Sequence, residues 1–94
     1  VLYLCMDKVL GHWSLYDLGA FSQSVMLAAA EQGLGTIPAI TLVNYPEVLR
    51  RELKIPENAK IAIGIAIGYT DTDNPINNFH SDRSPLDEVC VFCS

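Results

Sequence analysis

The chain has 94 residues, of which 50% are hydrophobic and 18% charged, a composition typical of an ordered globular protein. Its formal net charge is −5, and its six Lys and Arg residues leave no cationic stripe for a phosphate backbone, so we expect no nucleic-acid partner. The apolar content exceeds what one small core can easily hide. It therefore indicates either an obligate partner or further parts of the same domain.

The sequence contains no apolar run near the roughly 18 residues of a membrane span and no signal-peptide pattern, so we expect no membrane partner. Three cysteines make no small-scaffold disulfide framework, which favours a reducing, cytoplasmic setting. The chain starts directly in a strand-like run at Val1, which is compatible with a fragment whose targeting segment has been lost.

The first predicted elements are a short buried strand over residues 1–6, a loop over residues 7–13 and a long helix over residues 15–32. Apolar side chains recur in the helix at three- and four-residue spacing, at Leu18, Phe21, Val25, Met26 and Ala29. Because little polar face is left, this helix must be buried.

The ends and the small residues of this helix carry further signals. Ser14 or Asp17 could cap its start, and Gly33 is the expected left-handed residue past its end. The alanines at residues 28–30 allow another backbone to approach closely, so the helix is a candidate for a helix–helix or subunit seam.

The middle of the chain is apolar but interrupted. Residues 33–44 contain Gly35 and Pro38, which predicts an ordered buried loop or a short extended segment. Pro46 suits the first position of a short amphipathic helix that ends by residues 55–56.

Residues 61–68 alternate with period two, which predicts a strand. The large face consists of Ile61, Ile63, Ile65 and Ile67, and the small face of Ala62, Gly64, Ala66 and Gly68. Both faces must be covered, and the small face allows a helix or a flat ligand to approach the backbone.

The remainder is polar and irregular. Residues 69–84 form a long excursion, which in a compact domain is more often functional or partner-wrapping than idle. Ser84 and Pro85 can start a short helical turn, and residues 89–93 are expected to form a final strand or extended tail.

Arg83 is the only Lys or Arg after Lys60. It is either a solvated loop arginine or a bidentate phosphate clamp, since a guanidinium offers a planar fork of donors to an anion. Nothing local in the sequence decides between these two interpretations.

Cys90 and Cys93 form a C-x-x-C pair, but zinc would need two further ligands, and Cys5, His12 and His80 have no matching spacing. A redox pair belongs at a helix N-terminus, whereas this pair lies in an apolar tail. We therefore expect no metal site, and we find no acid, base or nucleophile motif that predicts a catalytic side chain.

An ordered set of segments resembles the C-terminal half of the FMN-dependent nitroreductase family, closest to the subgroup that acts on nitroaromatic compounds. The segments are WSLYDLG, SVMLAAAEQGLG, YPEVLRRELKIP, IAIGIAIGY, NPIN and RSPL, in this order along nearly the whole chain.

The resemblance implies an α+β FMN-binding fold in an interlocked homodimer, with FMN at the subunit interface and the C-terminal tail extending over the partner. Residues 1–94 are then the C-terminal portion of a single nitroreductase-like domain whose N-terminal part is absent. That absent part would carry the family's arginine-rich motif and a further asparagine.

The resemblance also implies cofactor-binding residues. Arg83 matches the family's FMN-phosphate arginine, and Ser81 stands where some relatives carry lysine, so the phosphate site is less basic. The loop against the flavin ring is matched by Pro38, Ala39, Ile40 and Thr41. The backbone N–H of Ile40 would face flavin N5, while Ile40 and Thr41 replace the acidic and glycine residues of many relatives.

The implied activity is two-step: NAD(P)H reduces FMN by hydride transfer, and a nitroaromatic compound or a quinone is then reduced in the same site. The 94 residues would need the missing N-terminal half for this activity and would be inactive alone. Two alternatives remain open: a non-catalytic dimerisation or flavin-binding module, and a small thiol redox protein that uses Cys90 and Cys93.

Overall fold

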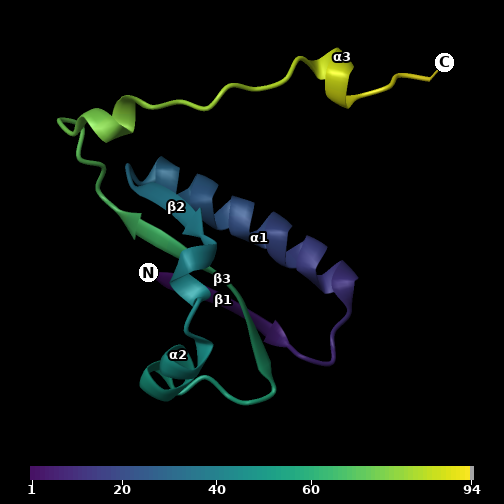
Figure 1. Ribbon diagram of the computed structural model, residues 1–94, viewed down its shortest axis with the longest axis vertical. Coiled ribbons are helices and arrows are strands. Elements are labelled where there is room, and N and C mark those ends of the chain that lie inside the picture. The colour runs from purple at the N-terminus through teal and green to yellow at the C-terminus, as the bar shows by residue number, and fades with distance from the viewer. Residues whose placement is uncertain (94) are drawn as a thin grey trace.

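The computed structural model describes residues 1–93 and is built on a three-stranded antiparallel sheet in the order β1-β3-β2 (Figure 1). The strands are β1 (Leu2–Asp7), β2 (Gly35–Ala39) and β3 (Ala59–Gly68). β3 lies in the centre because its branched isoleucines suit a strand paired on both edges. The strand predicted over residues 61–68 is confirmed and starts two residues earlier.

A β-bulge in β3 corrects one detail of the predicted alternation. The register pairs Leu4 with Ile63 but Cys5 with Ile61, so β1 contains no partner for Ala62 within the described residues. Because directly opposed residues point to the same face, Ile61 lies on the face of Cys5 and not on that of Ile63. The prediction that all four isoleucines share one face is wrong for Ile61.

Helix α1 (His12–Glu31) begins three residues before the predicted start. Its N-cap is Gly11, and no side chain within residues 1–93 caps it, so the prediction of Ser14 or Asp17 as the cap is wrong. The predicted end is confirmed: Gly33 has φ 73°, and the N–H groups of Gly33 and Leu34 donate to the carbonyls of Ala30 and Ala29. This pair of bonds is the Schellman motif.

Burial within one chain is less than predicted. The buried apolar residues are Leu4, Ala29 and Ile65, and of α1 only Ser22 and Ala29 are buried among the described residues. Trp13 is 85% exposed and Leu27 62%. The helix packs one face on the sheet and presents an apolar outer face to solvent, so the expectation that it is buried all round is wrong for one chain.

Residues 33–44 contain β2 and a short 3-10 helix, η1 (Ile40–Val43), where a buried loop or short extended segment was expected. The extended part is confirmed, but Ile37 is 65% exposed, so the segment is not buried in one chain. Helix α2 (Pro46–Leu53) has Pro46 in its first turn as predicted, and it ends at Lys54 in the left-handed conformation.

The C-terminal arm, residues 69–93, leaves the end of β3 and runs away from α2 (Figure 1). Every residue of the arm is exposed, and it contains the 3-10 helix η2 (Pro75–Asn78) and the single turn α3 (Leu86–Val89). The predicted irregular excursion, the helical turn after Pro85 and the extended tail are confirmed.

Candidate functional site

The loop formed by Pro38, Ala39, Ile40 and Thr41, here called the 38–41 loop, joins the end of β2 to η1. Ala39 is half-buried and the other three residues are exposed, Ile40 at 71%. Ala39 takes an extended conformation as the N-cap of η1, and no side chain within the described residues caps this turn. The first N–H groups of a 3-10 helix have no partner inside the helix, so the Ile40 N–H has neither an acceptor within η1 nor a side-chain cap in the described chain.

The 38–41 loop is held in place by the small face of β3. Ala39 is the register partner of Gly64, and η1 then folds back over the same glycine (Figure 1). A Cβ atom placed on Gly64 would lie 2.6 Å from the Cβ of Leu42 and 3.3 Å from the Cε1 of Tyr3. The expectation that this glycine face admits the close approach of another element is confirmed, and the element is η1.

Ser81 and Arg83 lie together on the C-terminal arm. The Arg83 guanidinium donates through Nη1 to the Ser81 carbonyl at 3.2 Å, to the Asp82 carbonyl at 3.1 Å and to the Ser81 hydroxyl. These contacts are exposed and local, so the guanidinium is accessible. One chain does not bring this pair to the 38–41 loop, because the arm begins beside the start of β2, where Gly68 pairs with Gly35, whereas η1 follows the end of β2 (Figure 1).

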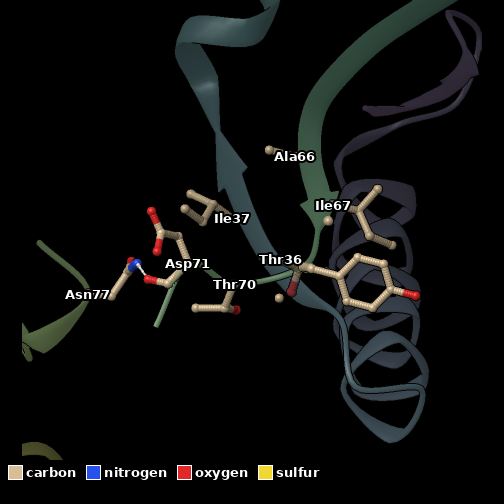
Figure 2. Close-up of a pocket in the computed structure, with 10 residues that line it drawn as sticks. Thr36, Ile37, Ala66, Ile67, Thr70, Asp71 and Asn77 are labelled. Atoms are coloured by element: carbon tan, nitrogen blue, oxygen red, sulfur yellow. Dashed lines mark hydrogen bonds between the residues drawn. The ribbon is translucent and has the colours of Figure 1, made fainter. Parts of the chain in front are cut away.

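A hollow of about 460 Å³, which was not predicted, lies where the start of β2 and the end of β3 meet the start of the arm. Thr36 and Ile37 line it from β2, and Asp71 and Asn77 line it from the arm (Figure 2). The Asn77 side-chain amide donates to the Asp71 carbonyl at 2.6 Å, so the arm holds its own shape here. Its only sequence signal is the run of Thr, Asp and Asn that follows directly after an apolar strand.

Within residues 1–93 there is no group of three His, Cys, Asp or Glu side chains that could hold a metal ion. Cys90 and Cys93 are exposed free thiols. In the described part of the chain, no helix has the length and apolar character needed to cross a membrane.

Comparison with known proteins decides what kind of fold this is. The sequence model of the Nitroreductase family matches residues 7–69, two-thirds of the chain. The chain belongs to the nitroreductase family. The matched range includes α1, the 38–41 loop and β3, while Ser81 and Arg83 lie outside it.

Curated nitroreductases match the chain over most of its length. It is 34% identical over 92 residues to the chloronitrobenzene nitroreductase of Comamonas testosteroni, which covers 97% of this chain and 40% of that protein. It is 33% identical over 79 residues to the 4-nitrobenzoate reductase of Nocardioides sp. (strain LMS-CY), covering 84% and 32%. The chain thus spans about a third to two-fifths of the length of these relatives.

A solved nitroreductase has the same fold. The FMN-dependent nitroreductase NfnB from Mycobacterium smegmatis, crystallised in complex with NADPH, superposes with a TM-score of 0.92 at 29% identity. The superposition covers 98% of this chain and 41% of that one. The α+β nitroreductase fold expected from the resemblance is confirmed, including the arm.

Proposed function

We propose that these residues are part of an FMN-dependent NAD(P)H oxidoreductase that reduces nitroaromatic compounds or quinones. The observation that carries the proposal is the superposition of 98% of the chain on an FMN-dependent nitroreductase that was solved with NADPH. Relatives named for chloronitrobenzene and 4-nitrobenzoate support the substrate class. The N-terminal remainder of the domain is required for activity, so the 94 residues alone are inactive.

The 38–41 loop is proposed to lie against the flavin ring. Its exposed surface leaves room for a flat ligand, and the Ile40 N–H lacks a side-chain acceptor in the described chain. A backbone donor at this point can serve flavin N5 whatever the side chain is, which makes the replacement of acidic and glycine residues by Ile40 and Thr41 tolerable. The apolar Ile40 side chain would help to exclude water from the ring.

Arg83 and Ser81 are proposed to hold the FMN phosphate. The guanidinium has exposed donors with no carboxylate partner in the described chain, and the Ser81 hydroxyl lies beside it. Since one chain keeps this pair away from the 38–41 loop, the complete FMN site would be assembled in an interlocked homodimer, with the arm of one copy extending over the other.

When bound, FMN supplies the hydride chemistry that no side chain of this chain provides. The residues named here bind and orient: the loop presents a backbone donor, Arg83 neutralises an anionic group, and neither needs to exchange a proton. Cys90 and Cys93 have no part in this reaction, and a cytoplasmic location agrees with it.

The test is to purify the complete polypeptide that contains these residues, load it with FMN, and follow NADH and NADPH oxidation with nitrobenzene and with a benzoquinone. We expect a yellow dimeric protein that oxidises the nicotinamide only when an acceptor is present. A yellow dimer without turnover would identify a flavin-binding module, and a colourless dimer a purely structural one. Either result would contradict the proposed activity.

A further inference from the structure

Gly64 lies at the point where three elements converge. It is the register partner of Tyr3 in β1 and of Ala39 in β2, and η1 lies over it through Leu42. A Cβ atom on Gly64 would be 2.6 Å from the Cβ and 3.0 Å from the Cδ1 of Leu42. The nearer of these atoms is next to the backbone of η1 and cannot rotate away.

The need for glycine here is one of space and not of backbone conformation. Among residues 1–93 the only glycine with positive φ is Gly33. Gly68, four residues further along the same strand, has no atom of the described chain within 4 Å of an added Cβ. Of the two glycines of β3, Gly64 is therefore covered by Leu42 of η1 and by Tyr3 of β1, whereas Gly68 is open.

We infer that Gly64 is a positioning residue, which sets how closely η1 and the 38–41 loop sit on the sheet and hence where the Ile40 N–H lies. This inference rests on the proposed function. Two residues hold the loop against Gly64: Ala39, within the loop, is its register partner, and Leu42, the residue that follows the loop, packs on it. An alanine at 64 would have to move η1 outward by about 0.8 Å to reach an ordinary contact of 3.4 Å.

Displacement of this size is enough to matter at a reacting centre. A misplacement of about 1 Å can lower a rate by about a hundredfold, because the reacting atoms lose their alignment. Binding of the distant phosphate should change little, since Ser81 and Arg83 lie on the arm. The expected signature is a loss of hydride-transfer rate with nearly unchanged FMN affinity.

The experiment uses the complete FMN-loaded protein and the variants Gly64→Ala and Leu42→Ala, with Gly68→Ala as the matched control. Single-turnover reduction by NADPH and the reduction potential of the bound flavin report on the loop at the ring. Amide hydrogen exchange of residues 40–43 in the flavin-free protein reports on η1 without activity. We expect Gly64→Ala to slow hydride transfer by about ten- to a hundredfold and to shift the potential. Amide hydrogen exchange in η1 of Gly64→Ala should be about tenfold faster than in the parent. Gly68→Ala should match the parent in hydride-transfer rate, potential and exchange.

Leu42→Ala tests the inference if Gly64→Ala does not fold, because it loosens the contact between η1 and Gly64 without adding an atom. A folded Gly64→Ala protein with a lower melting temperature but unchanged hydride-transfer rate, potential and exchange would overturn the inference. If the parent protein binds no FMN, the proposed function fails. Exchange of residues 40–43 then still tests whether Gly64 holds η1, and equal exchange in all variants would overturn that too.

Discussion

Arg83 is the residue for which the sequence leaves two roles open. Its guanidinium is accessible, and among residues 1–93 it donates to carbonyl and hydroxyl oxygens. We predict that Arg83→Ala in the complete protein weakens FMN binding more than riboflavin binding. Loss of one charge-assisted contact to the phosphate costs about 1.5–3 kcal/mol, or about ten- to a hundredfold in affinity. Fluorescence titration of both flavins measures the difference.

Arg51→Ala is the matched control, because Arg51 forms an exposed ion pair with Glu52 on α2 and lies outside the proposed site. It should leave both affinities unchanged. Equal weakening of FMN and riboflavin by Arg83→Ala would show that Arg83 does not contact the phosphate, and no weakening of either would assign it to the solvated-loop role.

A larger change at Gly64 tests packing alone. We predict that in the complete protein with flavin bound Gly64→Val lowers the free energy of unfolding by about 1–3 kcal/mol, because its branched side chain must enter the space taken by Leu42 and Tyr3. Thr72→Val, on the exposed arm, should be nearly silent. Thermal melting of both variants measures the difference. A melting temperature of Gly64→Val within about a degree of the parent, which corresponds to about a few tenths of a kcal/mol, would show that the small face of β3 is open.

The C-terminus of α1 gives a prediction at the scale of an element. In the complete protein, Gly33→Ala should lower the free energy of unfolding by about 1–2 kcal/mol, because a Cβ atom disfavours φ 73° even though no atom of the described chain lies within 4 Å. Gly19→Ala, inside the same helix and equally open, should stabilise by about 0.5–1 kcal/mol. Urea unfolding of both variants measures the two signs, and destabilisation by both would contradict the explanation.

The elements with a strong local period were predictable from the sequence. The alternation over residues 61–68 and the glycine at 33 specify a strand and a helix end by local sterics alone. The bulge at Ala62 and the cap at Gly11 were not predictable, since both depend on pairing and chain path rather than on residue type. Pro38 argued against a strand over residues 35–39, because proline is rare in strands except at sheet edges. β2 is such an edge strand.

At the scale of the whole molecule, the described chain is open. Its accessible surface is 7783 Å², whereas a compact monomer of 10.3 kDa has about 5,400 Å². Its radius of gyration is 16.7 Å, against about 12 Å for a compact domain of this length. The excess lies in the arm and in the outer face of α1, which carries Trp13, Tyr16 and Leu27.

We therefore predict that the 94-residue chain is not a stable compact monomer. Sedimentation velocity at low micromolar concentration should show association or an expanded species, and thermal unfolding should lack a cooperative transition. A compact monomer that unfolds cooperatively would mean that the arm folds back on α1, and the argument for cover by another chain or segment would fail.

The candidate site was predictable only in part. Its residues come from the resemblance, and nothing in their spacing places the 38–41 loop near Ser81 and Arg83. The 38–41 loop is fixed by the pairing of β2 with β3, whereas Ser81 and Arg83 lie on an exposed arm and are held by local hydrogen bonds. In the proposed homodimer a second chain brings the two groups together, and local sequence does not encode such a contact.

The position of Pro38 in β2 protects the chain against aggregation by strand addition. An edge strand offers unpaired backbone groups on which a foreign strand can add, and this is how aggregation starts. β2 stays paired with β3 from Gly35 to Ala39, and proline fits such a ladder only where its nitrogen faces the outer edge. The fourth residue of that five-residue edge therefore lacks a donor. The residue that opens the 38–41 loop also makes β2 a poor template for uncontrolled strand addition.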